Sequence, residues 1–285
     1  NSGTSIRLLM GLMAGLNISA EFTGDSSLSN RPMNRVINKL VTMGARFTST
    51  KFPIKLEAGV TDGDREININ IASAQVKTAI ILAALGVNGV TRITGKIQSR
   101  DHTERMLLSL SSAICVNQES ITVNGNYRKI NTFDLSVPGD ISSASFIIGS
   151  AILREGSSIK IKNLSANPYR LGFVEVLKRM GADISINFKK KTSCINEPMC
   201  DIKVRHSKLI GTNITPSEIP LLIDEIPLIS VLATQASGET VIRGASELRV
   251  KESDRISTTC MNLKNLGADV TEMKSGMAIN GRNNL

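Results

Sequence analysis

The feature that most constrains the fold is an internal repeat. Four segments share one order: an apolar helix, a β-rich stretch that ends in Gly or Asn, a polar loop, and a second helix that ends near Gly-Ala. The β-rich stretches end at Gly24, Gly95, Asn163 and Gly244, so the repeats are 71, 68 and 81 residues apart. These spacings exceed the roughly 20–50 residues of solenoid repeats. They predict instead a βαβαββ unit that is used several times.

Hydrophobic periodicity supports this interpretation. The spacing i, i+3, i+4, i+7 predicts one buried helix face from Phe173, Val176, Leu177 and Met180, and another from Ile6, Leu9, Met10 and Met13. The stretches "REININI", "SIKIKN" and "ETVIRG" alternate in the manner of half-buried strands. Glycines at 44, 181 and 267 stand where a helix C-cap requires a positive φ. The predicted fold class is therefore α/β or α+β with repeated units.

The domain organisation follows from length and from one break. A chain of 285 residues is longer than one core usually serves, which favours two domains. Pro138-Gly139 punctuates the chain between the second and third repeats. We expect domains at 1–137 and 138–285, with a ligand bound between them.

Composition limits the function classes. The net charge of +9 suits nucleic acid, an acidic membrane surface or small polyanions, but aromatic residues make up only 3% and leave little for base stacking. No apolar run reaches the roughly 18 residues of a membrane span. The four cysteines, Cys115, Cys194, Cys200 and Cys260, lack metal-binding spacing and are typical of free thiols in a reducing cytoplasm. Small anions are thus favoured over nucleic acid and membranes.

The first half of the chain holds three candidate anion-binding stretches. The opening "NSGT" has the residues of a helix start that binds an anion, although Ser2 or Thr4 can equally be a plain N-cap. Arg31 precedes Pro32, which suits a first helical turn, and either projects towards an anion or is a solvated surface Arg. In "IASAQVK", Ser73 is a cap or a phosphate donor, with Gln75 and Lys77 nearby.

A further stretch, "QSRDHTERM", places Ser99 and Arg100 before a predicted capping box formed by Asp101 and Glu104. The capping box is structural. Arg100 and His102 remain as functional candidates.

The second half contains two charged stretches. In "LLIDEIPLIS", Asp224 and Glu225 interrupt an apolar passage before Pro227, either as helix caps or as a general acid or base. The stretch "ELRVKESDRIS" is either a salt-bridged helix face or part of a basic ligand site, since each repeat has a polar cluster at this position.

Taken together, seven collinear motifs are similar to those of the 5-enolpyruvylshikimate-3-phosphate (EPSP) synthase family. They are "NSGTSIRLLMGL", "GDSSLSNRPM", "SAQVKTAIILAAL", "SRDHTERM", "VPGDISSASFIIGSAIL", "DEIPLISVLA" and "ELRVKESDRIS". The resemblance implies two domains of the enolpyruvyl transferase type (an inside-out α/β barrel), each of three βαβαββ units. About four of six units are visible, so we expect a chain truncated at both ends: 1–137 as the shikimate-3-phosphate-binding domain without its start, and 138–285 as the second domain without its end.

The resemblance also implies the activity: transfer of the enolpyruvyl group of phosphoenolpyruvate to the 5-hydroxyl of shikimate 3-phosphate, with release of phosphate. It implies no cofactor or metal, a cytoplasmic monomer, and glyphosate as a possible inhibitor because Gly3 adds no bulk. The truncated chain alone is expected to be weakly active or inactive. The alternatives are the related transferase that acts on UDP-N-acetylglucosamine and a non-catalytic phosphate-ligand-binding fragment.

Site residues are carried over by position. The shikimate 3-phosphate contacts implied are Ser73, Gln75, Ser99, Arg100, Asp224 and Lys251. Those for phosphoenolpyruvate are Gly3, Thr4, Arg31, Gln75 and Arg255, and the catalytic groups are Asp224, Lys251 and Glu252. Three positions depart from the family pattern: Ala74 replaces a second serine, His102 replaces a common Tyr, and Glu247 replaces a common Asn.

Overall fold

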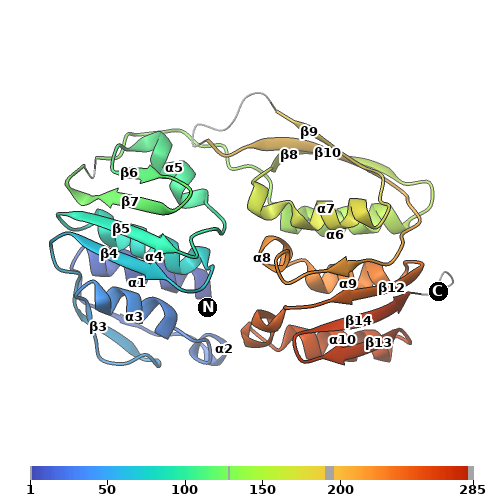
Figure 1. Cartoon of the computed structure of the whole chain (residues 1–285), viewed down its shortest axis with the longest axis horizontal. Helices are drawn as coiled ribbons and strands as arrows, with labels where there is room; N and C mark the ends of the chain where they lie inside the picture. Colours follow the sequence, from blue (N-terminus) through green and yellow to red (C-terminus); the bar gives the residue numbers. More distant parts are fainter. Residues whose placement is uncertain (1, 128, 190–195, 282–285) are drawn as a thin grey trace. The chain divides into compact units, whose positions relative to one another are not determined.

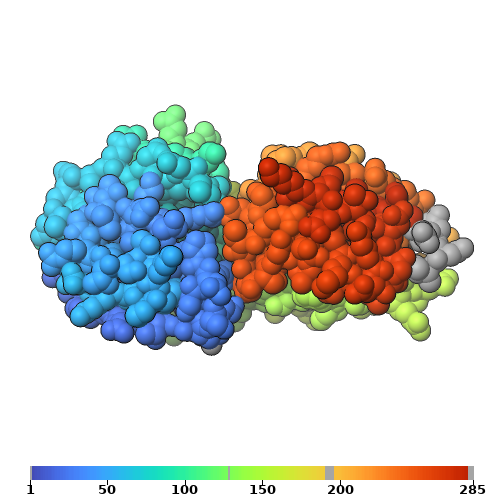
Figure 2. All heavy atoms as spheres, turned by 90° about the horizontal axis from the view of Figure 1, so that it is seen from below, coloured from blue at the N-terminus to red at the C-terminus, as the bar shows by residue number. Residues whose placement is uncertain are grey.

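The computed structural model describes residues 2–127, 129–189 and 196–281. These residues divide into two compact units, one up to Asp134 and one from Leu135 onward, with Asn196 grouped with the first (Figure 1). Each unit has its own cluster of buried hydrophobic side chains. In the space-filling view, the strands of the fourth repeat, in red, lie at the surface of the second unit (Figure 2).

The second repeat has the predicted βαβαββ order. Its elements are β4 (Arg65–Ile69), α4 (Ala74–Leu85), β5 (Val90–Gly95), α5 (His102–Leu110), β6 (Ile114–Val116) and β7 (Ser120–Asn124), followed by the 3₁₀ turn η1 (Gly125–Tyr127). β4 pairs with β5 in parallel, and β7 joins β5 to β6 with antiparallel pairing. The sheet order is β4-β5-β7-β6.

The fourth repeat copies this topology in the second unit. Its elements are β11 (Asn213–Ile214), α8 (Ile219–Leu222), α9 (Ile226–Thr234), β12 (Gly238–Ile242), η3 (Ser246–Val250), α10 (Arg255–Asn265), β13 (Asp269–Met273) and β14 (Gly276–Gly281). The order β11-β12-β14-β13, with one parallel and two antiparallel pairs, matches that of the second repeat.

The first and third repeats have the same three last strands. The first consists of α1 (Gly3–Gly15), β1 (Ala20–Phe22), α2 (Ser26–Ser29), α3 (Asn34–Thr42), β2 (Arg46–Phe47) and β3 (Ile54–Ala58). The third consists of α6 (Ile141–Leu153), β8 (Ser158–Ser165), η2 (Pro168–Arg170), α7 (Gly172–Arg179), β9 (Ile184–Phe188) and β10 (Met199–Arg205). Their sheets, β1-β3-β2 and β8-β10-β9, are equivalent. A single parallel bridge from Gly139 to Leu164 stands where a first strand would pair in the third repeat.

Backbone conformation confirms part of the predicted punctuation. Gly95 ends β5 and Gly244 follows β12, with φ values of 88° and 79°. Asn163 also has a positive φ, of 60°, but the prediction that it ends a strand is wrong, because β8 continues to Ser165. The glycines that follow α3, α7 and α10, at 44, 181 and 267, have φ values of 101°, 93° and 88°. The left-handed conformation is most accessible to Gly and then to Asn, which explains why these residue types mark the repeat.

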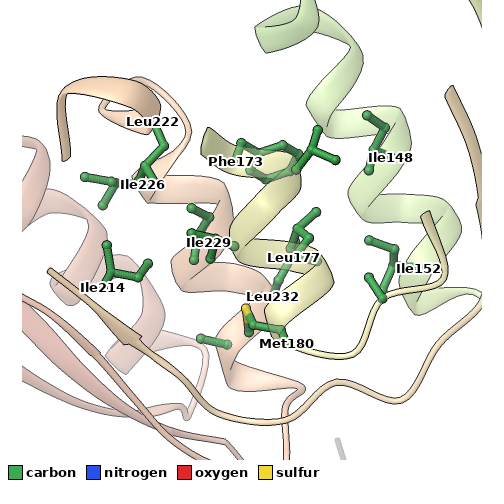
Figure 3. Packing of buried hydrophobic residues seen from close by; sticks show 14 of the residues in the cluster. Ile148, Ile152, Phe173, Leu177, Met180, Ile214, Leu222, Ile226, Ile229 and Leu232 are labelled. Carbon is green, nitrogen blue, oxygen red and sulfur yellow. The ribbon is translucent and has the colours of Figure 1, made fainter. Parts of the chain in front are cut away.

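The core of the second unit lies among helices. Figure 1 shows α6, α7 and α9 between the sheet of β8, β9 and β10 and the sheet that contains β12 and β14. Phe173, Leu177 and Met180 of the predicted face are fully buried there, against Ile148 of α6 and Ile229 of α9 (Figure 3). This prediction is confirmed.

The predicted face of α1 is wrong at one position. Leu9 is 43% exposed, whereas Ile6, Met10 and Ala14 are buried. The buried line therefore follows i, i+4, i+8, and Leu9 lies outside it.

Helices α1 and α4 approach each other unusually closely. A Cβ on Gly11 would lie 2.2 Å from the carbonyl oxygen of Ala79, and one on Gly15 would lie 2.6 Å from that of Ala83. Since residue numbers increase together along the contact, the two helices run parallel. Their N-termini therefore lie at the same end of the first unit.

Two further predictions concern environment. Within the described ranges, no helix combines the length and apolarity needed to cross a membrane. Cys115, Cys200 and Cys260 are free thiols, as predicted, and Cys194 lies outside the described residues. Burial raises the pKa of Cys200 to about 11, so this thiol is held in its neutral form near neutral pH.

The close contact of α1 with α4 generates a test. Gly11→Ala places a methyl group against the backbone of α4, so we expect the free energy of unfolding to fall by about 1–3 kcal/mol, as for other overpacked sites. The measurement is chemical denaturation of both proteins.

Gly149→Ala in α6 is the matched control. Its added Cβ would lie 3.4 Å from Leu232 Cδ2, an ordinary contact, and alanine favours a helix over glycine by about 0.8–1.0 kcal/mol. This variant should be as stable as the parent or more so. Equal effects of the two substitutions would contradict close packing of α1 on α4.

Candidate functional site

The first candidate cluster is built at the N-terminus of α1. Ser2 caps this helix by accepting a hydrogen bond from the backbone N–H of Ser5 at 3.1 Å, and Gly3 is buried in the first turn. A Cβ on Gly3 would lie 2.5 Å from Nη1 and 2.7 Å from Cζ of Arg31. The guanidinium group thus lies directly against the positive end of the helix dipole, an arrangement that attracts an anion. Asn1, the other residue of the opening motif, lies outside the described residues.

Gln75 joins this cluster from the first turn of α4. Its Nε2 donates to Thr4 Oγ1 at 2.7 Å, and its Oε1 accepts from Arg7 Nη1 at 2.5 Å. Arg7 Nη2 donates to the carbonyl oxygen of Pro32 at 2.9 Å. The structure therefore brings together four predicted residues, Gly3, Thr4, Arg31 and Gln75, at two parallel helix N-termini.

Arg7 is the member of this cluster that sequence reasoning missed. It is the single charged residue of "GTSIRLLMGLMAG", and it follows Thr4 by three positions on the same helix. An isolated arginine in an apolar helix, one turn from a predicted anion site, is the signal that could have identified it.

The prediction that Pro32 begins a helix is wrong. α3 begins at Asn34, with Met33 as its N-cap residue. Arg31 and Pro32 lie in the segment between α2 and α3, where the carbonyl of Pro32 is available to Arg7.

Ser73 and Ser99 lie on either side of a buried lysine. Ser73 caps α4 and accepts from the backbone N–H of Val76 at 3.4 Å, so its capping role is confirmed. Ser99 is buried before α5, and Arg100, which follows it, is half-buried. Lys77, which the sequence places near Ser73 and Gln75, is almost fully buried and forms an ion pair with Glu104 at 2.5 Å.

This ion pair overturns the predicted capping box. Asp101 occupies the N-cap position of α5 without a side-chain cap hydrogen bond, and it pairs with Arg105 at 2.9 Å. Glu104 turns inward to Lys77 rather than back to the helix start. His102 is the first residue of α5.

The second candidate cluster lies in the fourth repeat. Asp224 lies between α8 and α9, and its Oδ1 is 3.8 Å from Lys251 Nζ and 3.5 Å from Arg255 Nη1. Arg255 Nη2 donates to Glu252 Oε2 at 2.7 Å. The side chains of Asp224, Lys251 and Arg255 are 31%, 25% and 28% exposed, so solvent reaches all three. The structure thus brings together the four residues predicted here.

The neighbouring Glu225 belongs to a different, internal network. It is buried and accepts a hydrogen bond from Ser142 Oγ, which in turn accepts from Arg170 Nη2 at 2.6 Å. Arg170 also pairs with Asp140 at 2.5 Å. Burial would raise the pKa of Asp140, but the Arg170 charge and hydrogen bonds from Ser143 outweigh it and hold that pKa below its usual value.

The two units pair their helix starts with different side chains. Ser142 of α6 donates to Glu225, the N-cap residue of α9, whereas Thr4 of α1 accepts from Gln75, the second residue of α4. In the second unit, two carboxylates, Asp140 and Glu225, thus lie at this end. In the first unit, Arg7 donates to the neutral amide of Gln75, and Arg31 lies against Gly3.

Asp254 fixes the start of α10 and thereby the position of Arg255. It accepts from the backbone N–H groups of Ile256 and Ser257 at 3.1 and 3.0 Å and pairs with Arg249 at 2.6 Å. Burial opposes ionisation, but these hydrogen bonds and the Arg249 charge outweigh it and lower the pKa of Asp254. Among the described residues, no group of three or more His, Cys, Asp or Glu side chains could hold a metal ion.

Comparison with known proteins identifies relatives over the whole chain. A family model described as EPSP synthase (3-phosphoshikimate 1-carboxyvinyltransferase) matches residues 1–285. The 3-phosphoshikimate 1-carboxyvinyltransferase of Coxiella burnetii is 44% identical over 283 residues, which are 99% of this chain and 64% of the relative. That of Petrotoga mobilis is 44% identical over 285 residues, 99% of this chain and 66% of the relative. The chain thus spans just under two thirds of the length of these relatives.

Solved structures show the same fold. An EPSP synthase from Acinetobacter baumannii matches with a TM-score of 0.82 and 38% identity, covering 99% of this chain and 64% of that structure. The enolpyruvyl transferase NikO from Streptomyces tendae matches with a TM-score of 0.72 and 15% identity, covering 96% of this chain and 62% of that structure. The fold is therefore the mixed α/β enolpyruvyl transferase fold, which confirms the predicted fold class.

The capping role of Asp254 generates a pH-dependent test. Asp254→Ala removes an N-cap, so we expect the free energy of unfolding at neutral pH to fall by about 1 kcal/mol. Because the folded-state pKa of Asp254 lies below its usual 3.8, its contribution is present above that pH and is lost as the pH falls through the lowered value. Urea denaturation at neutral and acidic pH should therefore show the difference between parent and variant shrinking in acid.

Asp254→Asn is the matched variant. It keeps the capping oxygen without a titratable charge, and asparagine is a good N-cap residue. It should retain most of the stability that alanine loses. A stability loss of Asp254→Ala that does not change with pH would contradict the ionised cap.

Proposed function

The chain belongs to the EPSP synthase family, and from this premise we propose that the protein carrying it transfers the enolpyruvyl group of phosphoenolpyruvate to the 5-hydroxyl of shikimate 3-phosphate. Phosphate is released, and the product is EPSP. The activity is that of 3-phosphoshikimate 1-carboxyvinyltransferase, a step of the shikimate pathway towards aromatic amino acids. The 44% identity to two proteins with this name supports the assignment.

The observation that carries the proposal is the position of the Arg31 guanidinium against Gly3. It adds a full positive charge to the joined N-termini of α1 and α4, and Arg7 lies one helical turn further on. Phosphoenolpyruvate carries a phosphate and a carboxylate, and such groups suit both helix N-termini and the planar donor array of arginine.

The substrate contacts proposed are those carried over from the family. Phosphoenolpyruvate is assigned to Gly3, Thr4, Arg31, Gln75 and Arg255, and shikimate 3-phosphate to Ser73, Gln75, Ser99, Arg100, Asp224 and Lys251. Ser73 already accepts a backbone hydrogen bond, which leaves its hydroxyl proton available to a phosphate oxygen. Gln75 contributes to both sites through its bridging position.

The chemistry requires three proton transfers. The 5-hydroxyl of shikimate 3-phosphate attacks C2 of phosphoenolpyruvate and loses its proton, while C3 gains one. The tetrahedral intermediate then expels phosphate, and C3 gives up a proton as the double bond returns. We assign Asp224 as the base at the hydroxyl, and Lys251 with Glu252 to proton transfer at the enolpyruvyl group. Basic groups near both substrates offset the repulsion between two anions.

Asp224 is suited to its assigned role because its carboxylate faces solvent between two cations. Lys251 Nζ and Arg255 Nη1, 3.8 and 3.5 Å from its Oδ1, hold this carboxylate in place. Glu225, its neighbour, is committed to Ser142 and is not assigned a chemical step.

The related activity on UDP-N-acetylglucosamine is the alternative enzyme function. That family uses a cysteine on a mobile loop. Of the described cysteines, Cys200 and Cys260 are buried and Cys115 lies in strand β6. These positions favour shikimate 3-phosphate as the acceptor. The other alternative is a protein that binds a phosphate ligand without catalysis, and detectable turnover would exclude it.

The remaining proposals follow from the family. We propose a cytoplasmic monomer without a cofactor, in which glyphosate competes for the site next to Gly3 and inhibits turnover. Normal turnover in millimolar glyphosate would contradict this inhibition.

Substitution of Asp224 tests the reaction. With the protein that carries this chain at its native length, phosphate release from phosphoenolpyruvate should require shikimate 3-phosphate. Asp224→Asn should lower kcat by about 10²–10⁴-fold, the usual contribution of a general acid or base. Both rates are measured by following phosphate.

Asp201→Asn is the matched control, because Asp201 of β10 also lies between two lysines, 3.3 Å from Lys160 and 3.4 Å from Lys189. It should leave kcat essentially unchanged. Phosphate release that does not depend on shikimate 3-phosphate would refute the proposed function, and equal losses in the two variants would refute the role of Asp224.

A further inference from the structure

Lys77 and Glu104 form a buried ion pair that none of the proposed chemical steps uses. Their side chains are 2% and 3% exposed, and Nζ lies 2.5 Å from Glu104 Oε1. Lys77 belongs to α4 and Glu104 to α5, which are consecutive helices of the second repeat. Neither group can touch a ligand in solution, so any effect on the site must act through other residues.

The remaining hydrogen bonds of Lys77 go to one loop. Residues 96–101 connect β5 to α5, and we call them the 96–101 loop. Lys77 Nζ donates to the carbonyl oxygen of Ile97 at 3.0 Å and to that of Ser99 at 3.1 Å. With the bond to Glu104, all three ammonium protons have acceptors. One side chain thus fixes two carbonyls of the loop that carries Ser99 and Arg100.

The same helix carries the other half of this site. Ser73 caps α4 four residues before Lys77, and Gln75 lies in the first turn of α4, two residues before Lys77. The Lys77 bridge therefore sets the distance between Ser73 and Gln75 on one side and Ser99 and Arg100 on the other. A shared phosphate ligand requires these groups to be held at fixed positions before it binds.

Stability alone does not explain this buried ion pair. Glu104 Oε2 is buried and has no hydrogen-bond partner among the described residues. Burial raises the pKa of Glu104, although the Lys77 charge opposes the rise. Apolar residues of similar volume are often as stabilising as a buried ion pair, or more so. What they cannot supply is a donor to the two carbonyls.

We propose that Lys77 and Glu104 are positioning residues that hold the 96–101 loop against the first turn of α4 and so preorganise the binding of shikimate 3-phosphate. This inference rests on the proposed function for the identity of the ligand. Glu104 orients the Lys77 ammonium group, and Lys77 holds the loop.

The test replaces the pair as a whole, because a single substitution leaves a buried charge without its partner. Lys77→Met/Glu104→Leu removes both charges and keeps apolar volume. The matched control is Thr78→Val/Thr103→Val. The hydroxyls of Thr78 and Thr103 lie 2.9 Å apart and also link α4 to α5. Thr78 follows Lys77 and Thr103 precedes Glu104 in the sequence. Their hydrogen bond does not involve the loop carbonyls.

We expect the Lys77→Met/Glu104→Leu protein to unfold with the same cooperativity as the parent. Its amide hydrogen exchange should be faster than in the parent only at residues 96–101. Its Kd for shikimate 3-phosphate should rise at least about tenfold, a loss of about 1.4 kcal/mol. The Kd for phosphoenolpyruvate, whose assigned residues include none from the 96–101 loop, should change much less. The threonine control should match the parent in all three measurements.

Two outcomes would overturn the inference: unchanged exchange of the loop in the Lys77→Met/Glu104→Leu protein, or equal losses of affinity in both double variants. If the parent itself binds no shikimate 3-phosphate, the proposed function fails. The exchange of residues 96–101 then decides the positioning role alone.

Discussion

The close parallel contact of α1 with α4 is the constraint on which the candidate site depends. Glycines at 11 and 15 let the two backbones approach, and this brings both helix N-termini to one end of the first unit. Thr4 and Gln75 meet there, and Arg7 and Arg31 add charge to two helix dipoles that already attract anions. A side chain at either glycine would separate the helices and the residues that bind at their ends.

In the second unit, two helix starts also meet, but carboxylates of the chain itself lie there. Ser142 and Glu225 meet at the starts of α6 and α9, as Thr4 and Gln75 meet at the starts of α1 and α4. There Asp140 and Glu225 supply the negative charge themselves, with Arg170 between them. The exposed charges of that unit lie instead at Asp224, Lys251 and Arg255, next to the start of α10. The repeat thus provides two similar pairs of helix starts that carry different charged side chains.

Much of this fold could be predicted from the sequence because its signals are local. The positive φ of residues 95, 163 and 244 and of the helix-ending glycines follows from the residue type, and the buried face of α7 follows from spacing. The grouping of Asp224 with Lys251, Glu252 and Arg255 was expected from the family resemblance. The failures share a different cause: Glu104 forms an ion pair rather than a capping box, and Arg7 bonds Gln75, because partners 27 and 68 residues away decide both. Local pattern cannot show such contacts. The exposure of Leu9 likewise depends on which parts of α1 the rest of the first unit covers.

The central proposal is that the acceptor substrate is shikimate 3-phosphate, and thermal unfolding with ligand tests it most directly. The chain is melted with shikimate 3-phosphate and, separately, with UDP-N-acetylglucosamine. A ligand at a hundred times its Kd should add about 2.7 kcal/mol to the free energy of unfolding. The account predicts a higher Tm with shikimate 3-phosphate and no change with the nucleotide sugar. A higher Tm with the nucleotide sugar alone would contradict it.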